Sequence, residues 1–320
     1  MKPSLLLLPI WLLLPQSLSA QGQFRAMTWN VENLFDCRHD SLKQDEEFLP
    51  DSERQWTWGR FWRKVEDIGR VLMGVGGNRP PSLVALQEVE NDSVMIALTR
   101  RGPLRAIGYE YVMTDSPDLR GVDVALLYLP SDFRLIGSES RRVPSVENGL
   151  RPTRDILHAW GLLPNGETLH VVVCHMPSRA GGRANRRNRT LAVRTLNALV
   201  DSLMTDDLGC RLMVMGDFNA PLRDKSLKAV LASGRLRSLT PDKRRPTSGT
   251  YRYKGNWSWI DHILVSDVLR SEGREASLYS QFWMQRPSSD GTWYPRRTYL
   301  GTQYGGGVSD HVPVYCDIYW

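Results

Sequence analysis

Acidic, amide and imidazole side chains recur where apolar, strand-like segments of this sequence end. In chain order they are Asn30, Glu88, His175, Asp217, Asn219, Asp261, Asp310 and His311. Glu88 comes just after the apolar run Leu83–Leu86, so burial of its carboxylate would require a cation or hydrogen-bond donors. The ends of sheet strands are where α/β enzymes gather their sites, because a rigid sheet fixes the geometry while the loops stay open. The pattern therefore predicts a polar site at the edge of a sheet.

Each of these residues, taken alone, also has an ordinary structural explanation. Asn30 suits a hydrogen-bonding turn at a strand end, and His175 suits a satisfied interior histidine. The segment Gly216–Ala220 is rich in turn formers. Asp261 could pair with a neighbouring arginine, and Asp310 could act as a capping residue. No single residue therefore identifies a function.

The elements that must position these residues are mostly strands. Apolar or alternating patterns predict strands over Phe24–Val31, Ser82–Val89, Val122–Leu129, Asp155–Leu163, Leu169–His175, Arg211–Gly216, Trp259–Val265 and Val312–Tyr319. Several of them are nearly continuous apolar runs, which is typical of strands buried on both faces.

Helical patterns are fewer. Apolar residues three or four apart predict helices over Phe61–Leu72 and Leu191–Leu203. Tracts rich in Gly, Pro and Ser predict long loops at Pro241–Gly249 and Pro287–Gly307. Because strands outnumber helices, we expect a layered α/β fold and not a strict alternation of strand and helix.

Composition sets broad limits on class and partners. The chain has 320 residues, of which 41% are hydrophobic and 24% charged, and this balance excludes disordered and fibrous proteins. The formal net charge is +6, and 34 of the 41 basic residues are Arg. Arginine binds phosphates through a bidentate fork, which favours an anionic substrate. The base composition of the genome would explain the same bias equally well.

The first 20 residues are typical of a secretory signal peptide. Lys2 is followed by the apolar run Leu5–Leu14 and then by small residues up to Ala20. The apolar run is too short for a membrane anchor, which is the alternative interpretation. We expect cleavage after Ala20, export of residues 21–320 to the periplasm or the medium, and no integral membrane segment in the mature chain.

Four cysteines remain after that cleavage, namely Cys37, Cys174, Cys210 and Cys316. An even number in an exported chain permits disulfides. Cys174 and Cys316, however, lie in apolar strand-like segments, where buried free thiols are common. The sequence leaves both alternatives open.

Six motifs in fixed order resemble the endonuclease/exonuclease/phosphatase superfamily, which includes the type I deoxyribonucleases, apurinic-site endonucleases and neutral sphingomyelinases. The motifs are Trp29–Asn33, Leu86–Val89, His175–Pro177, Gly216–Ala220, Ile260–Leu264 and Ser309–Val314. The resemblance runs from about Arg25 to Trp320. It implies a single domain over residues 21–320 with an α/β, four-layer sandwich fold: two packed mixed β-sheets flanked by helices.

The resemblance also implies a divalent metal ion. Phosphoester cleavage concentrates negative charge on the phosphoryl oxygens, and Mg²⁺ with carboxylate ligands can stabilise that charge. Glu88 and Asp310 are expected to hold the ion, with Asn30 in its outer shell. Mg²⁺ is the expected cofactor, with Mn²⁺ or Ca²⁺ as alternatives.

The acid–base residues implied by the resemblance are Asp217, Asn219, Asp261, His311 and His175. Asp217 would orient or deprotonate the attacking water, while Asn219 would donate to a phosphoryl oxygen. Asp261 would pair with His311 and fix its tautomer. His175 matches a second histidine of the deoxyribonuclease and sphingomyelinase branches.

Substrate contacts are expected from basic and aromatic residues near these motifs. Arg179 and Arg183 follow His175 in a glycine-containing loop, and Arg120 precedes a predicted strand. Trp257 could stack on a nucleobase, although packing explains it equally well. The basic loop has a simpler alternative as solvated surface. The segment Ile260–His262 departs from the Cys-Asp-Arg signature of inositol-polyphosphate 5-phosphatases, which argues against inositol phosphates.

The function expected from the sequence is therefore that of an exported, Mg²⁺-dependent phosphodiesterase, acting as a monomer on nucleic acid. The alternatives are a hydrolase of phospholipids or small phosphoesters and, more remotely, a binding protein without activity on the same fold. Arginine-rich loops favour the polyanionic substrate.

Overall fold

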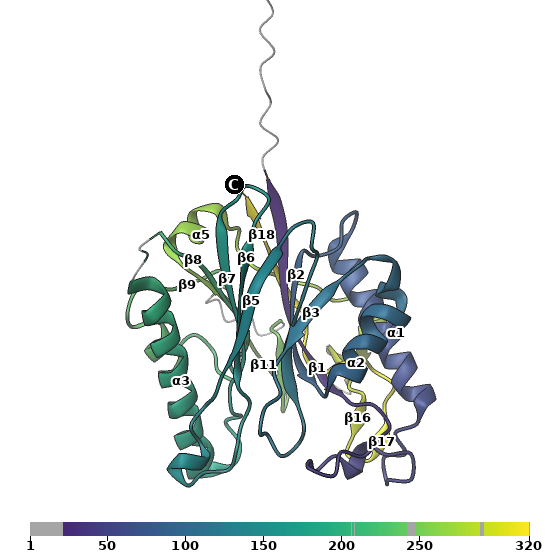
Figure 1. Ribbon diagram of the computed structural model, residues 1–320. Coiled ribbons are helices and arrows are strands. Elements are labelled where there is room, and N and C mark those ends of the chain that lie inside the picture. Colours follow the sequence, from purple (N-terminus) through teal and green to yellow (C-terminus); the bar gives the residue numbers. More distant parts are fainter. Residues whose placement is uncertain (1–21, 206, 208, 242–247, 289–290, 320) are drawn as a thin grey trace, which may run out of the picture.

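The computed structural model describes residues 22–205, 207, 209–241, 248–288 and 291–319, and its framework is a pair of six-stranded sheets (Figure 1). In spatial order, the first sheet consists of β13 (Ser277–Leu278), β18 (Val314–Tyr319), β1 (Gln23–Leu34), β2 (Leu83–Val89), β4 (Asp123–Tyr128) and β3 (Glu110–Met113). The second consists of β5 (Arg134–Arg141), β6 (Ile156–Leu162), β7 (Thr168–His175), β8 (Arg211–Asp217), β12 (Asp261–Val265) and β9 (Arg237–Ser238). Both sheets are mixed, because β1–β2 and β7–β8 are parallel pairs within otherwise antiparallel sheets.

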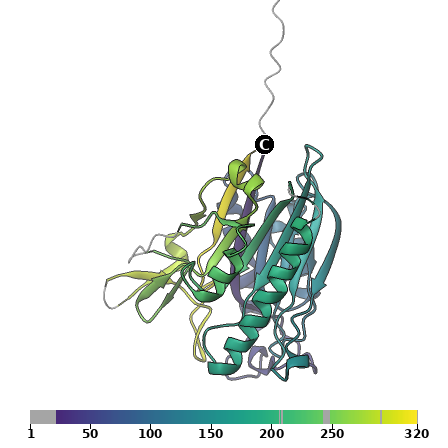
Figure 2. The same cartoon turned by 90° about the vertical axis from the view of Figure 1, so that its left-hand side faces the viewer.

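Helices cover the outer faces of the two sheets (Figures 1 and 2). They are α1 (Trp58–Gly76), α2 (Asp92–Ile96), α3 (Gly182–Thr205) and α4 (Lys225–Leu231). A further helix, α5 (Asp267–Glu272), instead packs Leu269 into the apolar cluster between the sheets. Short helical turns occupy Glu46–Phe48, Ala97–Arg101, Pro103–Ala106, Val146–Asn148 and Phe282–Met284. Among the described residues, no helix combines the length and the apolar character needed to cross a membrane.

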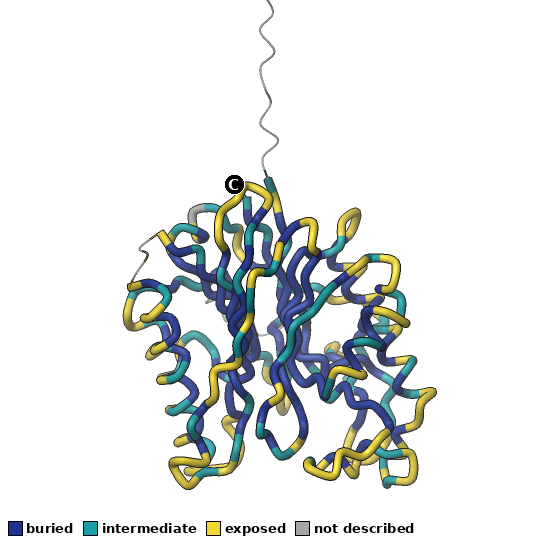
Figure 3. The backbone as a smooth tube through the Cα atoms, viewed as in Figure 1, coloured by how far each residue is buried: buried dark blue, intermediate teal, exposed yellow. Residues whose placement is uncertain are grey.

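Three buried clusters hold these layers together. One packs α1 against the first sheet, one fills the space between the sheets, and one packs α3 against the second sheet. Strand alternation explains this division: on β7, Val171 and Val173 face the other sheet, while Val172 and Cys174 face α3. Figure 3 shows the resulting buried strands between more exposed helices and loops. The predicted four-layer α/β fold is confirmed.

The strands and helices predicted from apolar patterns are all present, with most ends shifted by up to a few residues, but α3 begins at Gly182, well before the predicted Leu191. The sequence pattern missed the remaining strands and the shorter helices. β5 has alternating exposed and half-buried residues at the edge of its sheet, so it lacks a continuous apolar run.

The two tracts predicted to be loops have different outcomes. Of Pro241–Gly249, residues 242–247 lie outside the described part of the chain. The tract Pro287–Gly307 is not a plain loop. It contains β15 (Trp293–Pro295), which pairs with β14 (Gln285–Pro287), and the pair β16 (Tyr299–Leu300) and β17 (Gln303–Tyr304). A further hairpin joins β10 (Tyr251–Tyr253) to β11 (Asn256–Ser258).

The four cysteines are free thiols in the described structure, and all are buried. Burial raises the pKa of each of them, to about 12 for Cys37 and about 11 for Cys210. They therefore act as small apolar side chains of the core.

Candidate active site

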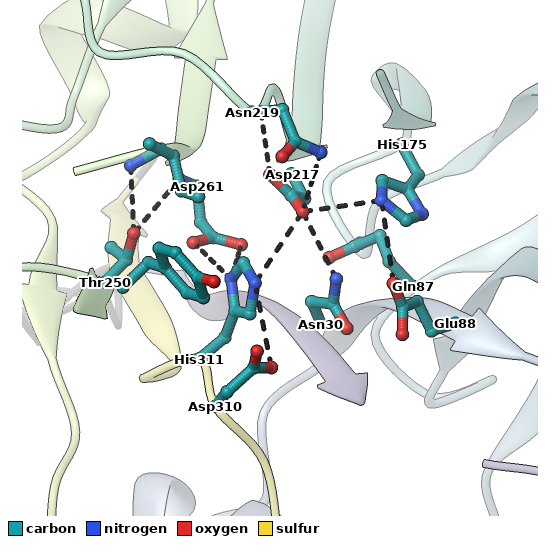
Figure 4. A network of polar contacts seen from close by, with 12 residues as sticks. Asn30, Gln87, Glu88, His175, Asp217, Asn219, Thr250, Asp261, Asp310 and His311 are labelled. Atoms are coloured by element: carbon teal, nitrogen blue, oxygen red, sulfur yellow. Dashed lines mark hydrogen bonds and ion pairs between the residues drawn. The ribbon is translucent and has the colours of Figure 1, made fainter. Parts of the chain in front are cut away.

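Strand register brings the predicted site residues to one edge of the two sheets. Asn30 lies opposite Gln87 near the carboxyl ends of the parallel pair β1–β2. His175 lies opposite Asp217 at the carboxyl ends of β7–β8, and Asp217 also lies opposite Asp261 at the start of β12. Figure 4 shows these side chains converging with those from the segment before β18.

Asp261 and His311 form a buried carboxylate–imidazole pair. The Nδ1 atom of His311 lies 2.9 Å and 3.1 Å from the two carboxylate oxygens of Asp261, and its Nε2 atom lies 3.9 Å from Asp217 Oδ2. Burial would lower the pKa of the His311 imidazole, but the charges of Asp261 and Asp217 outweigh it and hold that pKa well above its ordinary value. The hydroxyl of Thr250 accepts from the Asp261 backbone N–H at 3.2 Å, which fixes the start of β12.

Asp217 lies at the centre of the hydrogen-bond network. Its Oδ1 atom accepts from the backbone N–H of Asn219 at 2.7 Å, and its Oδ2 atom accepts from the amide of Asn30 at 3.2 Å. Burial, followed by the charge of Asp261, raises the pKa of Asp217 to about 7. The Asn219 amide donates to Asp217 Oδ2 at 3.2 Å and to the Met176 carbonyl at 3.0 Å. Asn219 thus holds Asp217 in place in this conformation.

His175 and Glu88 form the opposite side of the site. The Nε2 atom of His175 lies 3.5 Å from Asp217 Oδ2 and 3.9 Å from Glu88 Oε1. Burial and the charges of Arg154 and Arg120 hold the pKa of His175 well below its ordinary value, so its imidazole is neutral. Burial opposes ionisation of Glu88, but Arg120, 3.5 Å away, and other nearby cations outweigh it and lower the pKa of that carboxyl.

The strands bulge where they present these side chains. The pairing of β1 with β2 shifts register after Asn30, and the pairing of β2 with β4 shifts around Glu88. Glu32, Asn33 and Glu88 adopt left-handed backbone conformations, with φ of 51°, 55° and 63°. Such conformations cost about 1 kcal/mol each in a residue other than glycine and cluster at functional sites, where bulges re-aim side chains.

Gly216 is the residue that lets β7 and β8 approach next to Asp217. Its φ is 151°, and a Cβ atom at this position would lie 1.9 Å from the Cys174 carbonyl oxygen. Only glycine therefore fits at the first position of the Gly216–Ala220 motif.

Asp310 lies among further charged groups that the sequence patterns did not reveal. Its Oδ2 atom is 3.0 Å from Arg297 Nη2, and its Oδ1 atom is 3.9 Å from His311 Nε2. Burial, followed by the charge of Asp310, raises the pKa of Glu32 to about 8. Lys64 is buried beside Glu32, donates to its carbonyl oxygen, and feels the charges of Glu32, Glu88 and Asp310. These three carboxylates and Lys64 make up the acidic region of the site.

The residues of this region fit a hard divalent cation. A cation among Glu32, Glu88 and Asp310 would relieve the repulsion that disfavours ionisation of Glu32. A second group that could hold a metal consists of Asp217, Asp261 and His311, whose ligand atoms lie within 4.8 Å of one another. In that group, however, Nδ1 of His311 is already within hydrogen-bond distance of both Asp261 oxygens. The predicted ligands Glu88 and Asp310 are not in that second group, so their role as metal ligands stays a prediction.

Most residues of the site line one cleft with a volume of about 920 Å³, whereas Asp261 and Lys64 lie behind its described lining. Its lining includes Arg54, Arg120, Arg151, Arg154, Arg179 and Arg297. The predicted substrate residues Arg120 and Arg179 are therefore at the cleft, whereas Arg183 and Trp257 are not among the described residues that line it. Arg183 is exposed in the first turn of α3.

Strand alternation explains the place of Trp257. It pairs with Arg252 in the β10–β11 hairpin, whereas Tyr251, Tyr253 and Ser258 line the cleft. The hairpin thus presents tyrosines to the cleft instead of the predicted tryptophan. The Tyr251 ring also packs against His311, with 4.9 Å between ring centroids.

Sequence reasoning missed Glu32, Lys64, Tyr251 and Arg297. A signal existed for Glu32, because it is two residues after Asn30, the same spacing that links Asp217 to Asn219. Tyr251 and Arg297 follow no apolar strand, and Lys64 lies within a helical pattern. Only the tertiary structure places them at the site.

Comparison with known proteins gives a consistent family and fold. The family model of the endonuclease/exonuclease/phosphatase family matches residues 26–319. No curated protein sequence matches the chain significantly.

Similar folds occur among solved structures, at sequence identities that show the fold alone. A truncated TDP2 from Caenorhabditis elegans has a TM-score of 0.61 at 14% identity, over 93% of this chain and 98% of that one. The human Nocturnin catalytic domain has a TM-score of 0.57 at 19% identity, over 94% and 97% of the two chains. The Bacteroides thetaiotaomicron mannosyl-6-phosphatase has a TM-score of 0.58 at 18% identity, over 92% and 98%.

The family match extends over nearly all of the described chain and includes every residue of the network around Asp217. The fold similarity covers the same length. The chain therefore belongs to the endonuclease/exonuclease/phosphatase family.

Proposed function

We propose that the protein is an exported, divalent-metal-dependent phosphodiesterase that acts on nucleic acid. The observation that carries this proposal is that three kinds of group meet at one arginine-lined cleft. They are an imidazole–carboxylate pair, a second histidine and a separate group of carboxylates. A phosphodiester hydrolase needs groups that move a proton, groups that neutralise the phosphoryl oxygens, and a site for a cation.

The acid–base roles follow from the charges of the residues. Asp217, with its pKa raised to about 7, accepts a proton from the water that attacks phosphorus. Asn219 and Asn30 orient its carboxylate. His311, kept protonated by Asp261, offers its Nε2–H to the phosphoryl group as the bond from phosphorus to the leaving oxygen breaks. His175 is neutral and donates to an oxygen on the other side.

Glu88 and Asp310 would hold a divalent cation, with Glu32 beside them and Asn30 in its outer shell. When bound, such a cation supplies a Lewis acid that stabilises negative charge on the phosphoryl oxygens. Mg²⁺ is the preferred ion because the available ligand atoms are carboxylate and amide oxygens.

Nucleic acid is the preferred substrate because arginines line the cleft at several positions. The exposed side chains of Arg151 and Arg179 lie at the cleft beyond the central network, where phosphates flanking the scissile one would pass. The likeness to a mannosyl-6-phosphatase keeps a small phosphoester as a second candidate substrate.

An assay panel tests the proposal and separates the two candidates. Protein produced from residue 21 onward is offered plasmid, RNA, a nitrophenyl phosphodiester, a nitrophenyl phosphomonoester, mannose 6-phosphate and sphingomyelin, each with Mg²⁺ or with chelator. We expect Mg²⁺-dependent cleavage of the polynucleotides and of the diester. Turnover of mannose 6-phosphate or the monoester alone would favour the second candidate, and turnover of sphingomyelin alone would favour a lipid substrate.

We also propose that residues 21–320 form a single exported unit that acts as a monomer. Residues 1–21 lie outside the described part of the chain, so this proposal rests on the sequence. Amino-terminal sequencing of the full-length protein expressed in a bacterial host should find Gln21 as the first residue. A mass measurement by light scattering should give the mass of one chain.

A further inference from the structure

Arg297 reaches the active site from the tract predicted to be a loop. Its Nη2 atom lies 3.0 Å from Asp310 Oδ2 and donates to the Tyr251 hydroxyl at 2.9 Å. The Tyr251 ring in turn packs against the His311 imidazole, so Tyr251 links the guanidinium to the Asp310–His311 pair. Arg297, Asp310 and His311 all line the same cleft.

The backbone around Arg297 is held by contacts that reach deep into the site. The Thr298 N–H donates to Glu32 Oε2 at 2.8 Å, and Lys64 Nζ donates to the Thr298 hydroxyl at 2.6 Å. The Arg297 carbonyl accepts from the Gly307 N–H at 3.0 Å. A Cβ atom on Gly307 would lie 1.7 Å from the Arg296 carbonyl oxygen, so this close backbone pairing requires glycine. The backbone that carries Arg297 is therefore fixed, so binding a ligand through its side chain costs less conformational entropy.

The guanidinium keeps donors that the protein does not use. Both contacts of Arg297 named above involve Nη2, and no residue in the described ranges accepts a hydrogen bond from its Nε or Nη1. Its side chain is 33% exposed. Burial would lower the pKa of Arg297, but Asp310, Tyr251 and Glu32 raise it, so the group stays charged.

The carboxylates around Arg297 create a need for positive charge when an anionic group binds. The site contains carboxylates from Glu32, Glu88, Asp217, Asp261 and Asp310, and an anionic phosphoryl group entering it would be repelled. A charged guanidinium is well suited to hold phosphate oxygens. Because Nη2 already contacts Asp310 and Tyr251, the donors left for a phosphate are Nε–H and Nη1–H, each of which can bind one oxygen.

We propose that Arg297 is a phosphate-binding catalytic residue, whose unused N–H donors bind non-bridging oxygens of the phosphoryl group beside His311. This inference rests on the proposed function, because it needs a phosphoester substrate. The inference predicts that Arg297 contacts the phosphate itself and does not act only by positioning Asp310.

The experiment measures two affinities for Arg297→Gln, Arg297→Lys and the wild type. The first is the affinity for inorganic phosphate at saturating Mg²⁺, and the second is the affinity for Mg²⁺ without phosphate, both by calorimetry. We expect Arg297→Gln to weaken phosphate binding about tenfold or more, since charged hydrogen bonds are lost. Arg297→Lys, which keeps the charge but loses the planar set of N–H donors, should fall in between.

Arg270→Gln is the matched control. It removes one exposed positive charge from α5, which contributes no residue to the cleft lining within the described chain. Its phosphate affinity should equal that of the wild type. If Arg297→Gln is too unstable to measure, Arg297→Lys tests the same point.

Two results would overturn the assignment. One is a phosphate affinity in both Arg297 variants equal to the wild type at saturating Mg²⁺, with only the Mg²⁺ affinity changed, which would make Arg297 a positioning residue for Asp310. The other is a wild type that binds no phosphate with Mg²⁺ present. Failure of the proposed function looks different: the wild type would bind phosphate through Arg297 but cleave no phosphodiester.

Discussion

His311 and Asp261 join the two sheets at the active site, with 2.9 Å between His311 Nδ1 and Asp261 Oδ2. His311 lies just before β18 of the first sheet, whereas Asp261 begins β12 of the second. The Trp29 indole donates to the His311 carbonyl at 3.0 Å and ties the histidine to β1. The acid–base pair therefore depends on the packing of one sheet against the other.

Because Asp261 acts through His311, removing either should remove the same function. We predict that His311→Ala, Asp261→Ala and the double variant each lose activity by a similar factor, roughly 10²–10⁴-fold. The measurement is kcat/KM on a nitrophenyl phosphodiester. Losses that add in the logarithm of the rate would mean that the two residues have separate roles.

Much of this site could be predicted because its residues follow buried strands. Asn30, Glu88, His175 and Asp217 each end an apolar run, and parallel pairing brings those ends to one edge. The alternation of apolar residues along the strands likewise predicts which side of each strand packs against the other sheet. Local pattern and tertiary structure agree for these elements.

The residues that could not be predicted depend on contacts between distant segments. Arg297 reaches Asp310 only because Thr298 and Gly307 pin its backbone, and none of these belongs to an apolar pattern. The hairpin that carries Trp257 was not predicted, and the direction in which its side chains point depends on strand register.

Arg179 and Arg183 allow a matched test of polynucleotide binding, because only Arg179 lines the cleft. Arg179→Ala should weaken binding of single-stranded DNA and lower the salt dependence of log affinity by roughly one unit of slope. Arg183→Ala, which removes a neighbouring exposed arginine, should change both much less. The measurement is a salt titration of binding by fluorescence anisotropy. Equal effects of the two variants would show that the whole basic loop contacts the polymer, and no effect of either would make it a solvated surface.

Gly216 should be far less replaceable than a glycine that has a positive φ but lies in open space. We predict that Gly216→Ala lowers the free energy of unfolding by roughly 2–4 kcal/mol, because its Cβ would clash with the Cys174 carbonyl. Gly149→Ala is the control: Gly149 has φ of 65° with no atom near its added Cβ, so about 1 kcal/mol is expected. Urea denaturation measures both. Equal losses would mean that the β7–β8 approach is not tight.

A histidine pair away from the cleft should make stability depend on pH. His158 Nε2 lies 3.0 Å from His170 Nδ1, and His158 Nδ1 lies 3.0 Å from Glu139 Oε1. Burial lowers the pKa of both histidines, outweighing the opposing charges of Glu139 and Asp207, while Arg141 adds to the lowering at His158.

Below pH ~6.5 the two histidines bind protons more readily in the unfolded chain than in the folded protein. The free energy of unfolding should therefore fall as the pH drops from about 6.5 through the lowered pKa values. Above that range the pair should have no effect. We predict that His170→Gln makes the urea midpoint fall less between pH 7 and pH 5 than in the wild type. Parallel pH curves for the two proteins would contradict this assignment.

The proposed phosphodiesterase activity depends most directly on Glu88, the carboxylate expected to hold the metal ion. The most direct test is the rate of nitrophenyl phosphodiester hydrolysis during a Mg²⁺ titration of chelated wild type, Glu88→Gln and Glu90→Gln. Glu90 is a matched control because it is equally buried but accepts from the Asp36 N–H instead of lining the cleft. We predict that Mg²⁺ restores the wild type and Glu90→Gln, while Glu88→Gln stays ~100-fold or more below them with its fold intact. Full wild-type activity in excess chelator, or wild-type rates in Glu88→Gln, would contradict the account.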